Sequence, residues 1–159
     1  MSERTPPEHD SDYDGAWKEA LREYIESFLT VFFPDVSALI DWSCPQEWLD
    51  KELSQVLGEA GSRNRHVDLL VRVRLLTGEM CGILLHLEVQ TAYQLDFAER
   101  IARYNAGLFW TFRERVISLV VLADLRRDWC PTESVFECAG FEFRITFPVC
   151  KLIQRLESD

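Results

Sequence analysis

Two acidic residues, Asp68 and Glu88, lie on opposite arms of a predicted β-hairpin. Branched and apolar residues fill positions 65–74 and 83–90, and the segment between them contains Gly78, which is typical of a hairpin turn. If the turn centres on Gly78, Asp68 lies directly opposite Glu88. Directly opposed carboxylates repel each other across about 5 Å. A cation is therefore expected between them, and a hard divalent metal with oxygen ligands suits that place.

Strand side chains alternate between two faces, so the two acids share their face with Gln90, His86 and His66. The opposite face is apolar and consists of Val67, Leu69, Val71, Leu85, Leu87 and Val89. A turn placed one residue later would set Asp68 against Val89 and separate the acids. The two histidines are interpreted as polar strand residues, because they lack partners at zinc-site spacing. Solvated carboxylates on a polar strand face remain the alternative for the acids.

This constellation resembles the PD-(D/E)XK nuclease superfamily, in which an Asp on one strand and a (D/E)-X-K on its antiparallel neighbour bind the catalytic metal. Asp68 matches the first acid and Glu88 the second, whereas Gln90 stands where Lys is usual. The wider pattern is similar to one branch, the recombination-promoting nuclease/transposase family, where Gln is usual at that position. The stretches that carry the resemblance are 17–21, 40–42, 49–53, 67–71, 86–90 and 97–100.

The resemblance implies an α/β fold with a restriction-endonuclease-like core, a mixed β-sheet flanked by helices. It also implies a metal-dependent DNA endonuclease linked to recombination or mobile elements. Asp68 and Glu88 would hold Mg²⁺ or Mn²⁺, and Gln90 would orient the attacking water. Members often add an acid from the first helix, which is Glu19 here. For Gln90 and Glu19 the alternatives are a plain polar strand residue and a solvated helix acid. Asp50 and Glu52 carry the same ambiguity as Glu19.

Arginines are candidates to replace the missing lysine. Arg72 lies four residues from Asp68 and therefore on the same face of the strand. We expect Arg72 and Arg100 to balance charge on the phosphate. Arg100 and Arg103 lie three residues apart on one helical face, where they could bind a phosphodiester. Pairing with Glu99 or Asp96 is the alternative for these two residues.

Charge is unevenly distributed along the 159-residue chain, whose net charge is −10. Residues 1–60 hold fourteen acidic and four basic residues, whereas residues 61–159 hold thirteen of each, and twelve of these bases are arginine. The second half therefore suits phosphate recognition, with a modest and salt-dependent affinity for DNA. The acidic first half and the missing lysine motivate an alternative function, a catalytically inactive nuclease fold that binds DNA or a protein.

Composition also bears on location and partners. Hydrophobic residues make up 47% of the chain, which predicts one folded domain, and no apolar run is long enough to span a bilayer. The polar N-terminus is unlike a signal peptide, and the five scattered cysteines indicate reduced thiols, so we expect a cytoplasmic protein without a membrane partner. The many aromatic residues leave a homodimer open. No glycine-rich phosphate loop or G-x-S-x-G motif is present, which leaves nucleotide-binding and serine-hydrolase functions without support.

The predicted elements place the acids on a domain of residues 14–153, between a disordered tail of residues 1–13 and a C-terminal tail of residues 154–159. Asp14 is expected to cap a helix that Pro34 ends. Beyond the hairpin, we expect a strand at 38–42, helices at 46–57 and 95–112, a buried strand at 116–122 parallel to the Glu88 strand, and a strand pair within 135–147.

Overall fold

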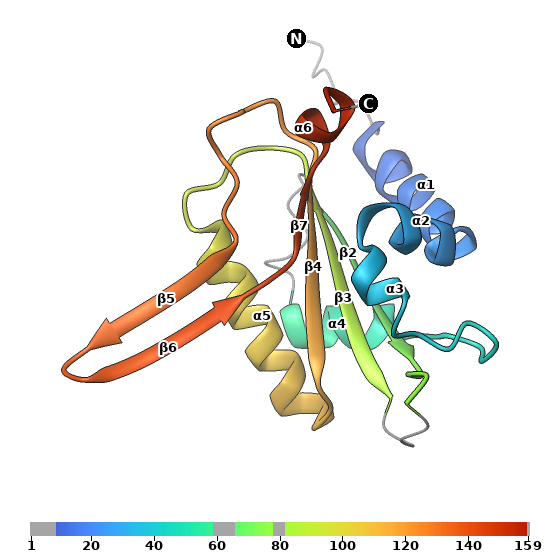
Figure 1. The fold of residues 1–159 in the computed structure, drawn as a ribbon, viewed down its shortest axis with the longest axis horizontal. Coiled ribbons are helices and arrows are strands. Elements are labelled where there is room, and N and C mark those ends of the chain that lie inside the picture. The colour runs from blue at the N-terminus through green and yellow to red at the C-terminus, as the bar shows by residue number, and fades with distance from the viewer. Residues whose placement is uncertain (1–8, 59–65, 78–81, 159) are drawn as a thin grey trace, which may run out of the picture.

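A five-stranded mixed β-sheet with helices on both faces forms the centre of the protein (Figure 1). The computed structural model describes residues 9–58, 66–77 and 82–158. The strands are β1 (Glu47–Trp48), β2 (His66–Val73), β3 (Ile83–Gln90), β4 (Val116–Leu122), β5 (Glu133–Cys138), β6 (Phe141–Thr146) and β7 (Val149–Lys151). The helices are α1 (His9–Glu23), α2 (Ile25–Phe32), α3 (Pro34–Ser37), α4 (Asp50–Leu57), α5 (Phe97–Phe112) and α6 (Leu152–Leu156). The expected mixed sheet flanked by helices is confirmed, and its strand order is β1-β2-β3-β4-β7.

The predicted hairpin register is confirmed. Strands β2 and β3 are antiparallel, with Asp68 opposite Glu88 and His66 opposite Gln90. The predicted turn residue Gly78 lies outside the described residues. Strand β4 pairs with β3 in parallel after the α5 crossover, as expected, so β3 is a central strand and all eight of its residues are buried.

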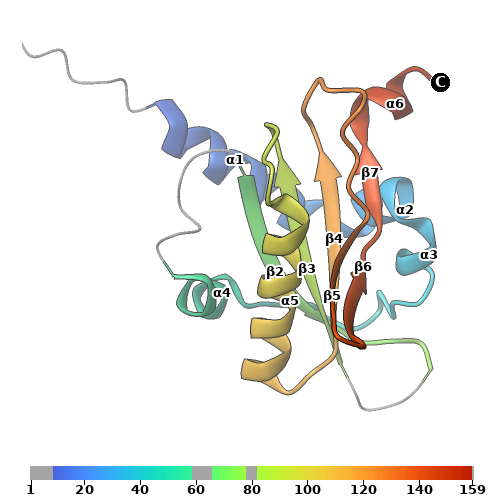
Figure 2. The ribbon, with the colours of Figure 1, turned by 90° about the vertical axis from the view of Figure 1, so that its left-hand side faces the viewer.

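The two faces of the sheet differ in chemistry. One face packs against α1 and α2 through a single large apolar cluster that includes Leu29, Leu69 and Leu87. The other face is covered by α4 and α5, and Figure 2 shows α5 lying across it with α2 and α3 on the far side. Two smaller apolar clusters form there, one around Leu70 and Leu108 and one around Phe97, Ile101 and Val120. A row of buried polar side chains lies on this second face: His86, Glu88, Gln90 and Ser118.

The N-terminal helix differs from the expectation in two ways. Helix α1 begins at His9, so Asp14 lies within the helix and is not its cap, and residues 9–13 of the predicted tail are helical. Residues 1–8 lie outside the described part of the chain. The helix also breaks at Tyr24, whose backbone angles of φ −114° and ψ 23° separate α1 from α2. Because backbone hydrogen bonds flank the break on both sides, the result is a bend between two helices.

The segment between α3 and α4 differs from the prediction in two places. The predicted strand at 38–42 is reduced to a single bridge between Ile40 and Leu75. The predicted helix at 46–57 begins only at Asp50, because Glu47 and Trp48 pair with β2 as strand β1. At the other end of the chain, α6 crosses the predicted domain boundary at residue 153.

Strands β5 and β6 confirm the predicted strand pair, but they form a separate two-stranded sheet, here called the arm. The arm projects past α5 (Figure 1). Phe136 faces Phe143 across the arm and Cys138 faces Phe141, so these side chains share one face. The three phenylalanines are 45–59% exposed. Strand β7, which was not predicted, returns the chain to the main sheet beside β4. Within the described residues, no helix is long and apolar enough to cross a membrane.

Candidate metal centre

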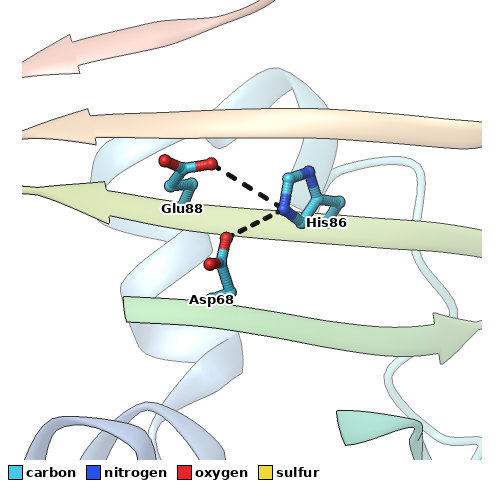
Figure 3. Close-up of side chains that lie close together, drawn as sticks. All are labelled: Asp68, His86 and Glu88. Carbon is cyan, nitrogen blue, oxygen red and sulfur yellow. Dashed lines mark hydrogen bonds and ion pairs between the residues drawn. The ribbon is translucent and has the colours of Figure 1, made fainter. Parts of the chain in front are cut away.

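Three potential metal-ligating side chains converge where β2 and β3 meet: Asp68, His86 and Glu88 (Figure 3). One ligand atom of each lies within 4.8 Å of the other two. His86 Nε2 lies 3.1 Å from Asp68 Oδ1 and 4.0 Å from Glu88 Oε2. The His86 and Glu88 side chains are completely buried, whereas 11% of the Asp68 side chain is exposed. Solvent therefore meets this cluster on the Asp68 side.

The two carboxylate oxygens of Glu88 have different surroundings. Oε1 accepts a hydrogen bond from Arg100, whereas Oε2 is buried without a hydrogen-bond partner. Burial raises the pKa of the Glu88 carboxyl well above its usual range, and the charge of Asp68 adds to this, while Arg100 opposes it. A buried oxygen of this kind is unusual in proteins and indicates a place where a proton or a cation can be bound.

The second ring nitrogen of His86 is held by a hydroxyl group. Nδ1 lies 3.1 Å from Ser118 Oγ on the neighbouring strand β4. Asn105 of α5 donates from Nδ2 to Ser118 Oγ and to the Val116 carbonyl, both at 3.0 Å. The Tyr104 ring meets the imidazole edge-on, with centroids 6.2 Å apart. These contacts fix the orientation of the imidazole, so Nε2 faces the two acids.

Arg100 reaches the cluster from α5 and supplies a cation within the protein. Its guanidinium donates to Glu88, to Gln94 and, at 3.0 Å, to Gln90 Oε1. Gln90 Nε2 in turn donates to the Ala92 carbonyl at 2.7 Å. Both ends of the Gln90 amide are thus engaged, and in this structure Gln90 holds Arg100; that Gln90 orients a water stays a prediction. Arg100 therefore places a positive charge beside Glu88, and its expected role in balancing charge on a phosphate stays a prediction.

Glu19 is not brought to the cluster. It is exposed on α1, a helix that packs against the opposite, apolar face of the sheet. Asp50 and Glu52, at the start of α4, also lie outside the cluster. Asp50 pairs with Arg22.

Arg72 and Arg103 also lie apart from the acids. Arg72 is four residues from Asp68 along β2, about 13 Å at strand spacing. Its guanidinium donates to Glu114, with the shortest contact at 2.7 Å, and to Glu47, so it joins β1, β2 and the segment before β4. In this structure Arg72 is paired with these carboxylates, and its phosphate contact stays a prediction. Arg103 is 76% exposed and pairs with Glu99 at 2.7 Å.

His86 and Ser118 are the site residues whose roles the sequence analysis missed. The H-x-E-x-Q spacing does place His86 on the face of Glu88 and Gln90, but we interpreted it as an ordinary strand residue. Ser118 is the single polar residue in the apolar run 116–122, which was a usable signal for a buried hydrogen-bonding role. The side chain of His66 lies outside what the structure describes.

Comparisons with protein-family models, with curated proteins and with solved structures found no match to this chain.

Proposed function

We propose that this protein is a metal-dependent DNA endonuclease of the PD-(D/E)XK type, linked to recombination or mobile elements and acting in the cytoplasm. The observation that carries the proposal is the buried Glu88 Oε2, which has no hydrogen-bond partner and faces His86 beside Asp68. Leaving such an oxygen unpaired is unfavourable, and a cation bound between the acids would remove that penalty. Asp68 and Glu88 lie on antiparallel neighbours, as the resemblance to this superfamily and its restriction-endonuclease-like core implies.

Each residue of the cluster would have its own role in such an enzyme. Asp68 and Glu88 would hold Mg²⁺ or Mn²⁺, and the bound ion would polarise the phosphate and lower the pKa of a water molecule. Arg100 stays on Oε1 of Glu88, where it favours the ionised carboxylate that a metal needs. Gln90 holds Arg100 in place. DNA would approach from the Asp68 side, the solvent-facing side of the cluster.

Contacts with the DNA backbone would come from arginines outside the cluster. Arg103 points to solvent one helical turn from Arg100, so it stays a predicted phosphate contact. With a net charge of −10, the chain should bind DNA weakly and lose affinity steeply as salt rises.

Cleavage of supercoiled plasmid in Mg²⁺ or Mn²⁺ tests the proposal. Wild type should nick the plasmid, whereas Asp68→Asn, which keeps the side-chain shape, should be at least about 100-fold slower because a metal ligand is lost. Asp128→Asn is the matched control, since Asp128 is an exposed partner of Arg126. Equal cleavage by wild type and Asp68→Asn would show that Asp68 takes no part in the reaction.

A second function, a catalytically inactive nuclease fold that binds DNA or a protein, is favoured by one observation. His86 and Glu88 are completely buried, and Arg100 already supplies a positive charge to Glu88. Thermal unfolding with added Mn²⁺ or Mg²⁺ separates the two functions, because an ion that binds only the folded state raises its stability. An inactive fold should show no shift with either ion. The homodimer stays a prediction.

A further inference from the structure

The three ligand atoms lie within 4.8 Å of one another, and the two distances from His86 Nε2 are close to those found around a single ion. Metal–ligand bonds of about 2.1 Å place neighbouring ligands roughly 3.0–3.4 Å apart. The 3.1 Å between Asp68 Oδ1 and His86 Nε2 already lies within that range. The 4.0 Å between His86 Nε2 and Glu88 Oε2 needs a closure of less than about 1 Å, which a carboxylate rotation can supply. Glu88 Oε2 is buried and accepts no hydrogen bond from the described residues, so it keeps a lone pair for a cation.

His86 is arranged as histidine ligands in metal sites are. A ligating histidine typically binds the ion through one ring nitrogen and donates the other N–H to an oxygen, which fixes the tautomer and the ring orientation. Ser118 Oγ lies 3.1 Å from Nδ1, and its two lone pairs can accept from both Nδ1 and Asn105. In that tautomer Nε2 carries a lone pair toward Asp68 and Glu88. Three lone-pair donors then face one point, and a cation there satisfies all of them.

We propose that His86 is the third ligand of the metal, and that its nitrogen makes the site select a first-row transition ion such as Mn²⁺ over Mg²⁺. This inference rests on the metal-dependent function proposed above. Mg²⁺ prefers oxygen ligands and near-ideal octahedral geometry, whereas an imidazole nitrogen favours transition metals. Ser118 is a positioning residue, since it acts on the ion only through the imidazole.

Metal titration of the full chain by calorimetry tests this selection. Wild type should bind Mn²⁺ at least about tenfold more tightly than Mg²⁺. His86→Asn, whose short amide can still reach Ser118 but cannot replace Nε2, should lose most of the Mn²⁺ affinity and little of the Mg²⁺ affinity. Ser118→Ala should weaken Mn²⁺ binding by about 10–100-fold, the usual effect of removing the partner of a ligating histidine.

Pulsed electron paramagnetic resonance of Mn²⁺ bound to wild type gives a direct readout that needs no variant. A ¹⁴N coupling to the ion is expected, and it should be absent from Mn²⁺ bound to His86→Asn. If Mn²⁺ and Mg²⁺ bind equally, without ¹⁴N coupling, and Asp68→Asn abolishes both, the metal site exists but His86 is not its ligand. That result overturns this inference and leaves the proposed function standing. If neither ion binds wild type, both this inference and the proposed function fail.

Discussion

Replacing Arg100 with glutamine should destabilise the protein strongly, because it leaves Glu88 buried without its cation. The Arg100 side chain is only 13% exposed and that of Glu88 is 0% exposed, so water cannot replace the guanidinium. Breaking a buried pair by removing one partner costs about 3–5 kcal/mol. Part of this cost is the lost hydrogen bonds to Glu88, Gln90 and Gln94, each worth about 1 kcal/mol.

Arg103→Gln is the matched control, because it changes the same residue type on the same helix at an exposed position. It should change the free energy of unfolding by less than about 0.5 kcal/mol. Adding Glu88→Gln to Arg100→Gln removes the stranded charge, so the double variant should recover about 2 kcal/mol relative to Arg100→Gln alone.

The assay is urea unfolding followed by tryptophan fluorescence at neutral pH with a chelator present, so that no metal contributes. The reasoning is refuted if Arg100→Gln is no less stable than Arg103→Gln. It is also refuted if the double variant is less stable than Arg100→Gln, since Glu88 would then need no counter-charge.

Three further predictions concern pH, Arg72 and the arm. The pKa of Glu88 is raised on folding, so its contribution to stability is complete below its ordinary value of 4.5 and is lost as pH rises through the folded pKa. Metal-free unfolding in urea at a series of pH values should show this decline in wild type and not in Glu88→Gln. Arg72→Gln should lower the free energy of unfolding by about 1–2 kcal/mol, because it disconnects Glu47 from Glu114, and should leave Mn²⁺ affinity in calorimetry unchanged. Phe136→Ser should change the free energy of unfolding by less than about 0.5 kcal/mol because the ring is 59% exposed, whereas Phe97→Ala, at 0% exposed, should cost about 3–5 kcal/mol in the same urea assay.

The acid pair could be predicted from the sequence because a hairpin is a local structure. Once a turn position is assumed, the period of two determines which residues of the arms face each other, and Asp68 meets Glu88 without any knowledge of the rest of the fold. Parallel pairing of β3 with β4 followed in the same way from an apolar strand, a helix and a second apolar strand.

The burial of the cluster's side chains could not be predicted, because it depends on how α5 packs against the sheet. Helical spacing shows that Arg100 and Arg103 share a face, yet only the packed structure shows that one is buried against Glu88 and the other points to solvent. Strand β1 was missed for a related reason. Glu47 and Trp48 follow a helix-compatible pattern, and pairing with β2 decides their conformation.

The arm leaves the fold and returns to it at one point. Thr132 and Phe147 flank residues 133–146, and the Phe147 amide already donates to the Thr132 carbonyl at 3.0 Å. A short turn could therefore bridge the two without displacing β7, which follows directly. The two strands of the arm therefore leave and rejoin the rest of the fold side by side, at Thr132 and Phe147. Strand β5 of the arm also contacts α5, so a change in the arm reaches the acids through the helix that carries Arg100.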